Sequence, residues 1–181
     1  MNFKLPIDPL EEEEIEFYTG VGSRDIPFDV KFLMKRCGYV LANLGYILRS
    51  GGADGSDKAF EDGCDQIDDS LKRIWRAEDA TYEAIEIARK LHARWDLVKP
   101  HAAKLHGRNV FQVLGKGLKA PSKFVICYTH DGCTQHEDRT AKTGGTGTAI
   151  SVASEREIPI LNLKLLNHRK KVEEWLLWFR R

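Results

Sequence analysis

The sequence predicts an α/β fold of the doubly wound type, in which helices cover both faces of a mostly parallel, Rossmann-like sheet. Short apolar runs alternate along the chain with segments whose apolar residues recur at helical spacing, and this alternation is typical of parallel sheets. Three glycine-rich loops each follow a predicted strand and precede a predicted helix. The length of 181 residues fits one domain, residues 1–181, with an extended segment at 1–14 that ends in four solvated glutamates.

Strands and helices alternate through the first half of the chain. Residues 15–21, 46–48 and 72–75 are predicted to form the first three strands. Helical spacing begins at Asp29, and Gly45 ends this helix. Its apolar positions are Val30, Leu33, Met34, Cys37, Val40, Leu41 and Leu44. A second, short helix is expected at 58–64.

The second half of the chain continues the same pattern. A helix is expected at 81–95 and another at 101–114, interrupted near Gly107 because glycine weakens helices. Residues 124–128 form the clearest buried strand, and residues 158–163 form the last one. The polar stretch 129–143 precedes a helix that runs to residue 155, and a final helix is expected at 169–179.

Composition narrows the class of protein. The chain has 28 Lys and Arg against 27 Asp and Glu, a net charge of +1, which does not favour extensive nucleic-acid binding. No stretch approaches ~18 apolar residues and the start lacks a secretory pattern, so we expect no membrane association and a cytoplasmic location. The four cysteines show no disulfide framework, which agrees with a reducing compartment.

The three glycine-rich loops occupy residues 19–24, 50–57 and 143–148. In an open parallel sheet such loops lie at the carboxyl ends of the strands, where ligands bind. The third loop contains Gly144, Gly145, Thr146, Gly147 and Thr148. Its glycines allow a close approach of the backbone, and the following helix start attracts phosphate. The alternative is a tight turn without a ligand. Neither a P-loop nor a dinucleotide fingerprint is present.

The loop sequences, TGVGSR at 19–24, SGGADGSD at 50–57 and GGTGT at 144–148 with Ala149 and Ala153, resemble the SLOG superfamily. This group joins the Rossmann-like domain of the recombination mediator Smf/DprA with the "lonely guy" phosphoribohydrolases. The resemblance covers residues 14–163, and the variant looks like the stand-alone recombination-mediator-like proteins of bacteriophage genomes. It implies action in the cytoplasm of a bacterial or phage-infected cell.

The resemblance also implies a set of ligand-binding residues. The first loop would line one side of a pocket through Gly22, Ser23 and Arg24. The second would line another, with acidic groups suited to ribose hydroxyls, through Gly51, Gly52, Asp54, Ser56 and Asp57. The third would cradle phosphate through Gly144, Gly145, Thr146, Gly147 and Thr148. Without a ligand, Arg24 would be a solvent-facing arginine, and the two aspartates would serve as turn and helix-capping residues.

One departure from the family bears on activity. The phosphoribohydrolases carry a glutamate three residues after the last threonine of the glycine motif, and Ser151 stands there in this chain. Without this carboxylate the water-activating group is missing. We therefore expect no catalytic residue and no separate cofactor, but binding of a phosphate-bearing nucleotide or derivative, such as a signalling nucleotide or an ADP-ribose-like molecule.

Two other functions stay open. The first is a nucleotide N-glycosidase in which Asp54, Asp57 or Asp131 replaces the glutamate. The second is a DprA-like mediator that binds single-stranded DNA.

Several further residues have two interpretations each. Arg108 and Asn109 open a predicted helix and are expected to reach the pocket from across the sheet; the alternative is a helix-capping or surface role. Cys127, His130, Cys133 and His136 fall three residues apart, but structural zinc sites use two separated pairs of ligands, so we expect no metal.

The stretch 129–143 is a candidate lid. Trp175 and Trp178 predict a contact between two copies of the chain.

Overall fold

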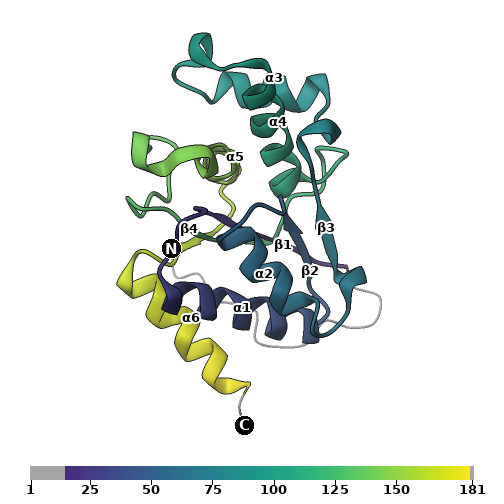
Figure 1. Ribbon diagram of the computed structural model, residues 1–181, viewed down its shortest axis with the longest axis vertical. Helices are drawn as coiled ribbons and strands as arrows, with labels where there is room; N and C mark the ends of the chain where they lie inside the picture. Colours follow the sequence, from purple (N-terminus) through teal and green to yellow (C-terminus); the bar gives the residue numbers. More distant parts are fainter. Residues whose placement is uncertain (1–14, 180–181) are drawn as a thin grey trace.

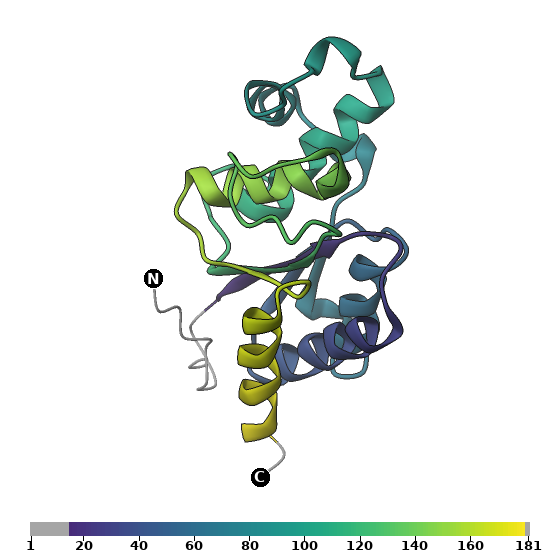
Figure 2. The same cartoon turned by 90° about the vertical axis from the view of Figure 1, so that its left-hand side faces the viewer.

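The computed structural model describes residues 15–179, which form a five-stranded, all-parallel sheet with helices on both faces (Figures 1 and 2). The strands are β1 (Phe17–Gly22), β2 (Ile47–Ser50), β3 (Lys72–Ile74), β4 (Phe124–Tyr128) and β5 (Ile160–Asn162). The predicted α/β, doubly wound fold class is confirmed. The segment predicted at 1–14, with its glutamates, lies outside the described residues.

The strand order β3-β2-β1-β4-β5 places β1 at the centre of the sheet. Thr19 pairs with Arg49 of β2 on one side and with Val125 of β4 on the other. The chain therefore winds outward from β1 to β3, returns across the sheet, and winds outward again from β4 to β5. The connections after β1 and β4 leave the sheet in opposite directions, which creates the switch point where open α/β sheets bind ligands.

One face of the sheet is covered by α1 (Phe28–Asn43), α2 (Ser56–Cys64) and α6 (Leu166–Trp178) (Figure 1). Alternate residues of β4, namely Phe124, Ile126 and Tyr128, belong to the core on this side, as the two-residue period of a strand requires. Helices α1 and α2 pack closely because Gly38 and Gly63 have no side chain. A Cβ at either position would overlap backbone of the other helix.

The opposite face is covered by α4 (Pro100–Leu114) and α5 (Gly147–Glu155), while α3 (Tyr82–Lys90) packs mainly on α4 and stands away from the sheet (Figure 1). Val125 and Cys127 of β4 belong to the core on this side. None of the helices within residues 15–179 is long and apolar enough to cross a membrane.

The helices differ from the prediction in several places. Helix α3 ends at Lys90, and Trp95 begins a separate 3₁₀ helix, Trp95–Leu97. Helix α4 is continuous through Gly107, because this glycine lets α3 approach: a Cβ there would lie 2.7 Å from Ile85 Cγ1. The last helix begins at Leu166 rather than at residue 169.

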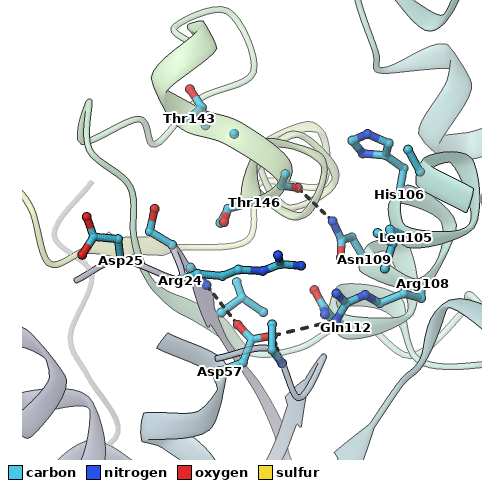
Figure 3. A pocket seen from close by; sticks show the side chains of 17 residues that line it. Arg24, Asp25, Asp57, Leu105, His106, Arg108, Asn109, Gln112, Thr143 and Thr146 are labelled. Carbon is cyan, nitrogen blue, oxygen red and sulfur yellow. Dashed lines mark hydrogen bonds and ion pairs between the residues drawn. The ribbon is translucent and has the colours of Figure 1, made fainter. Parts of the chain in front are cut away.

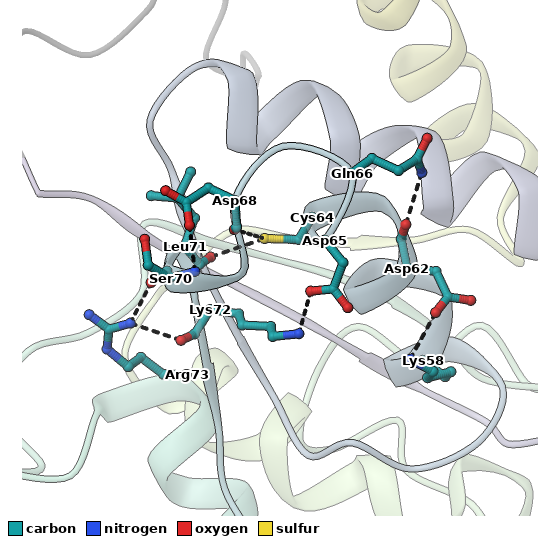
Figure 4. A network of polar contacts seen from close by, with 10 residues as sticks. All are labelled: Lys58, Asp62, Cys64, Asp65, Gln66, Asp68, Ser70, Leu71, Lys72 and Arg73. Carbon is teal, nitrogen blue, oxygen red and sulfur yellow. Dashed lines mark hydrogen bonds and ion pairs between the residues drawn. The ribbon is translucent and has the colours of Figure 1, made fainter.

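The connection from α2 to β3 is held by a polar network (Figure 4). The Cys64 thiol donates to the Leu71 carbonyl at 3.2 Å, and Lys72 forms an ion pair with Asp65. Asp68 Oδ1 accepts from the Ser70 N–H at 2.8 Å. These contacts fix the start of β3 at the edge of the sheet.

Candidate functional site

A cavity of about 400 Å³ lies at the carboxyl end of β1, between the loops of the sheet and helix α4 (Figure 3). The chain lines it from four segments: the loop after β1, the start of α2, the middle of α4 and the segment before α5. The lining residues are Val21, Gly22, Ser23, Arg24, Asp25, Ala53, Asp57, Ala102, Leu105, His106, Arg108, Asn109, Gln112, Thr143, Gly144, Gly145 and Thr146. The cavity therefore sits at the switch point.

Asp57 joins the first two glycine loops beneath the cavity. Its Oδ1 accepts from the Gly22 N–H at 3.2 Å, and its Oδ2 accepts from the N–H groups of Gly51 at 3.1 Å and Ala53 at 3.5 Å. Burial raises the pKa of the Asp57 carboxyl to about 6, although Arg108 and the three N–H donors act in the opposite direction. Asp57 therefore organises the first two loops with one or two backbone hydrogen bonds to each oxygen, while its side chain also lines the cavity.

Arg108 reaches the same point from α4. Its Nη1 lies 3.8 Å from Asp57 Oδ2. With the Gln112 side-chain amide oriented so that its oxygen faces Arg108, Nη1 also donates to this oxygen at 2.8 Å. A Cβ on Gly51 would overlap the Arg108 guanidinium. The glycine at position 51 therefore makes room for a buried arginine, and Arg108 brings a positive charge to the floor of the cavity.

Arg24 enters the cavity from the loop after β1. This loop is fixed by three hydrogen bonds of Ser23. Its N–H donates to the Tyr128 carbonyl at 2.9 Å, and its carbonyl accepts from the Ser56 N–H at 3.1 Å and from Ser56 Oγ at 2.9 Å. The Arg24 side chain extends across the cavity toward α4 (Figure 3). Among residues 15–179 its guanidinium has no hydrogen-bond or ion-pair partner, so this charge is available to a ligand.

The third glycine loop forms the opposite wall. It is a 3₁₀ helix, Ala141–Thr146, broken at Gly144, where φ is 62° and ψ is −154°. This left-handed conformation favours glycine. Side chains at Gly144 or Gly145 would meet no atom within 4 Å, so both backbones are open to the cavity. Asn109 Nδ2 donates to the Gly145 carbonyl at 2.8 Å and holds the loop against α4. The positive end of the α5 dipole follows directly.

His106 completes the wall formed by α4. Its Nδ1 lies 2.7 Å from Thr148 Oγ1, and its ring packs against His92 and Trp95 with centroid distances of 4.8 and 5.9 Å. Burial, with smaller effects from His92 and Arg139, lowers the pKa of His106 to about 4. The imidazole is therefore neutral at physiological pH and contributes a polar but uncharged surface.

The structure brings together eight of the predicted site residues. Those that line the cavity are Gly22, Ser23, Arg24, Asp57, Arg108, Gly144, Gly145 and Thr146. The other six do not line it. Asp54 is exposed to solvent, Ser56 supports the first loop, and Thr148 faces His106. The three glycines stand behind the wall, where Gly51 accommodates Arg108, Gly52 accommodates Arg76 and Gly147 accommodates Arg139.

Ser151, which stands where the phosphoribohydrolases that the loops resemble carry a glutamate, is fully buried and does not line the cavity. Its Oγ accepts from Arg139 Nη1 at 2.9 Å and lies 2.8 Å from His136 Nδ1. The chain thus has no carboxylate at position 151, and the Ser151 hydroxyl takes part in an internal hydrogen-bond network.

The stretch 129–143, predicted as a candidate lid, is tied down at several points. Asp131 accepts from Thr140 Oγ1 at 2.6 Å and also from the Thr143 hydroxyl. Although burial opposes it, these bonds lower the pKa of Asp131 to about 2. Asn162 Nδ2 donates to the Cys133 carbonyl at 2.8 Å. Only the end of this stretch, Thr143, reaches the cavity.

The cysteines and histidines spaced three residues apart do not converge. Cys127 is buried inside β4, the Cys133 thiol donates to the Gln135 carbonyl at 3.1 Å, and His136 faces Ser151. Within residues 15–179 no three His, Cys, Asp or Glu side chains are grouped so as to hold a metal ion.

Sequence reasoning missed most of the wall that α4 provides. The residues not anticipated there are Ala102, Leu105, His106 and Gln112. The four-residue spacing of Arg108 and Gln112, and of Ala102 and His106, is the signal that would have placed these side chains on one face of the helix. No protein-family model, curated protein or solved structure matches the chain, so its function is inferred from the geometry of the cavity.

Proposed function

We propose that the protein binds a phosphate-bearing nucleotide, or a small molecule derived from one, in the switch-point cavity and does not turn it over. The observation that carries this proposal is the convergence of three positively polarised groups on one space. They are the unpaired guanidinium of Arg24, the buried Arg108 and the start of α5 behind Gly144 and Gly145. Together they suit an anionic group.

The shape of the cavity supports a small ligand. Its volume of about 400 Å³ falls within the range typical of small-molecule sites. Beside the charged groups, Val21, Ala102 and Leu105 offer apolar surface, which suits the uncharged part of a nucleotide. The phosphate would lie between Arg24 and the backbone of Gly145, and the rest of the ligand toward α4.

Binding is favoured over hydrolysis because the buried carboxylate of the lining is already engaged with the backbone of the loops. Asp57 uses both oxygens to hold backbone N–H groups, and Ser151 occupies the glutamate position behind the wall. Asp25 lies exposed at the rim. These features, with the resemblance of the glycine loops to the SLOG superfamily, support a cytoplasmic nucleotide-binding member of that group rather than a phosphoribohydrolase or a DNA-binding mediator.

The proposal is tested by mass spectrometry of small molecules released from the denatured protein, combined with a thermal-shift panel of nucleotides. We expect a phosphate-bearing compound to raise the melting temperature, and Arg24→Gln to remove most of this shift without changing the melting temperature of the free protein. Because the side chain is exposed and unpaired, its loss costs no internal contact. If no nucleotide shifts the wild-type protein, the proposed function is wrong.

A further inference from the structure

Two neighbouring residues of α4 face different walls of the cavity, because successive side chains of a helix project about 100° apart. Arg108 packs against the second glycine loop, where a Cβ on Gly51 would overlap its guanidinium. Asn109 instead donates to the Gly145 carbonyl of the third loop at 2.8 Å. A phosphate between Arg24 and Gly145 lies on the third-loop side, so the groups on the second-loop side stay available.

Arg108 has donor capacity left on the second-loop side. Its Nη1 is engaged with Asp57 and Gln112, whereas Nη2 and Nε have no hydrogen-bond partner within residues 15–179. Only 10% of the side-chain surface is exposed, and buried donors in native proteins are nearly always paired. Because Arg108 lines the cavity, we expect a bound molecule to supply the partner of Nη2.

A second guanidinium lies beside the same loop. Arg76 follows β3 at the carboxyl edge of the sheet, and its Nη1 donates to the Gly52 carbonyl at 3.2 Å. A Cβ on Gly52 would lie only 2.6 Å from this Nη1, so the loop backbone and the guanidinium are in close contact. Arg76 is exposed, and its Nε and Nη2 have no partner in the part of the chain that the structure describes. Since Ala53, the next residue of the loop, lines the cavity, Arg76 lies at the rim.

The charges of these arginines are close enough to affect one another. Burial lowers the pKa of Arg108, Asp57 acts in the opposite direction, and the charges of Arg76 and Arg24 lower it further. Figure 3 shows the Arg24 side chain extending toward Arg108.

Negative charge compensates this cluster only in part. Asp57 lies 3.8 Å from Arg108. The other carboxylates around the three arginines form no ion pair with them within residues 15–179; these are Asp25, Asp54, Glu61 and Asp79. The second-loop side of the cavity therefore keeps an excess of positive charge, which attracts an anion.

We infer that the ligand is a nucleoside 5′-diphosphate, whose second phosphate is bound by Arg108 Nη2 and Arg76 on the second-loop side. The first phosphate is held by Arg24 and the third loop, as in the proposed nucleotide site on which this assignment rests. The two phosphates of a diphosphate share one bridging oxygen, so they can occupy adjacent positions in a single cavity. Guanidinium groups suit both positions, because their N–H donors match the oxygens of a phosphate.

The test is calorimetric titration of the full chain with the 5′-mono- and 5′-diphosphates of the four common ribonucleosides. Inorganic phosphate and pyrophosphate serve as probes without a base. We expect a diphosphate to bind at least about tenfold more tightly than the monophosphate of the same nucleoside, because contacts with the second phosphate are added. Pyrophosphate should exceed phosphate in the same way. Arg76→Gln should lower the affinity for the diphosphate to about that for the monophosphate, with the circular dichroism spectrum unchanged because Arg76 is exposed.

Arg73→Gln is the matched control. Arg73 is an exposed arginine of β3 that donates to the carbonyls of Ser70 and Lys72. Its replacement removes the same charge without removing a proposed contact, so the diphosphate should bind as tightly as it does to the wild type. An equal loss of diphosphate affinity in Arg73→Gln and Arg76→Gln would reveal a general effect of net charge and would overturn the second phosphate site.

The outcomes separate a missing second phosphate site from a missing nucleotide site. If a monophosphate binds as tightly as its diphosphate, or if the difference survives in Arg76→Gln, the second phosphate site is wrong and the nucleotide site stands. If none of the nucleotides and neither inorganic probe binds, both proposals are wrong.

Discussion

Replacing Gly145 by aspartate separates the stability of the glycine loop from its proposed role in binding. A side chain at this position meets no atom within 4 Å, and Gly145 is not among the glycines with positive φ. The substitution therefore introduces neither overlap nor backbone strain. A carboxylate just before α5 interacts favourably with the helix dipole, which contributes about 0.3–1 kcal/mol. The free variant should be as stable as the wild type or slightly more stable.

The same carboxylate should prevent phosphate binding. At a separation of roughly 5 Å and an effective dielectric constant of about 20, two negative charges repel by about 3 kcal/mol. This energy corresponds to a loss of affinity of about a hundredfold. Isothermal titration with a nucleotide that shifts the wild-type melting temperature measures the loss, and thermal denaturation measures the stability.

Gly145→Asn is the matched control, since asparagine has nearly the same shape without the charge. We expect it to bind within about tenfold of the wild type. Unchanged affinity of Gly145→Asp would refute the placement of phosphate at this loop. An equal loss in both variants would show that bulk, and not charge, is what the site rejects.

Two further predictions concern the residues around the cavity. Burial lowers the pKa of His106 to about 4, whereas a histidine in an unfolded chain has a pKa of about 6.5. Between these two pH values the unfolded state binds more protons than the folded state. The protein should therefore lose stability as the pH falls from about 6.5 to 4. His106→Gln should reduce this dependence in denaturant unfolding at several pH values; an unchanged slope would contradict a neutral buried His106. Ser151→Ala should lower the free energy of unfolding by about 1–3 kcal/mol, because Arg139 and His136 lose a buried partner. Its nucleotide affinity should equal that of the wild type, and a clear loss of affinity would mean that Ser151 contributes to the ligand site.

The fold could be predicted from the sequence because the signal for each strand and each glycine loop lies within a short segment. The apolar run at Phe124–Tyr128 and the glycine loops after β1, β2 and β4 are each visible within a few residues. Alternation of strands and helices then determines a parallel sheet, and a parallel sheet brings these loops to one edge. For this reason the sequence alone predicts that the three loops lie at one edge of the sheet, and residues of all three line the cavity.

The detailed roles of the glycines and aspartates could not be derived in this way. Gly51, Gly52 and Gly147 accommodate arginines that come from 57, 24 and 8 positions away, at Arg108, Arg76 and Arg139. A glycine that admits a distant side chain and one that admits a ligand have the same appearance in a sequence. Asp54 and Asp57 likewise look alike in the sequence, yet Asp57 is buried and accepts hydrogen bonds from the loop backbone, whereas Asp54 is exposed to solvent.

Most of the wall formed by α4 was missed for a different reason. The helix reaches the cavity through tertiary packing, so the spacing of its lining residues shows that they share a face but not what that face contacts. Gly107 illustrates the point: helix propensity predicts a break, whereas close packing on Ile85 of α3 requires a glycine within a continuous helix. Tertiary contacts of this kind override local preference.

The most direct test of the central claim is a calorimetric comparison of nucleoside 5′-monophosphates with the same nucleosides lacking phosphate. If Arg24 and the start of α5 hold the phosphate, the monophosphates should bind at least about a hundredfold more tightly than the nucleosides, and Arg24→Gln should remove most of this difference. Equal binding of a nucleoside and its monophosphate, or no binding of either, would contradict a phosphate site in this cavity.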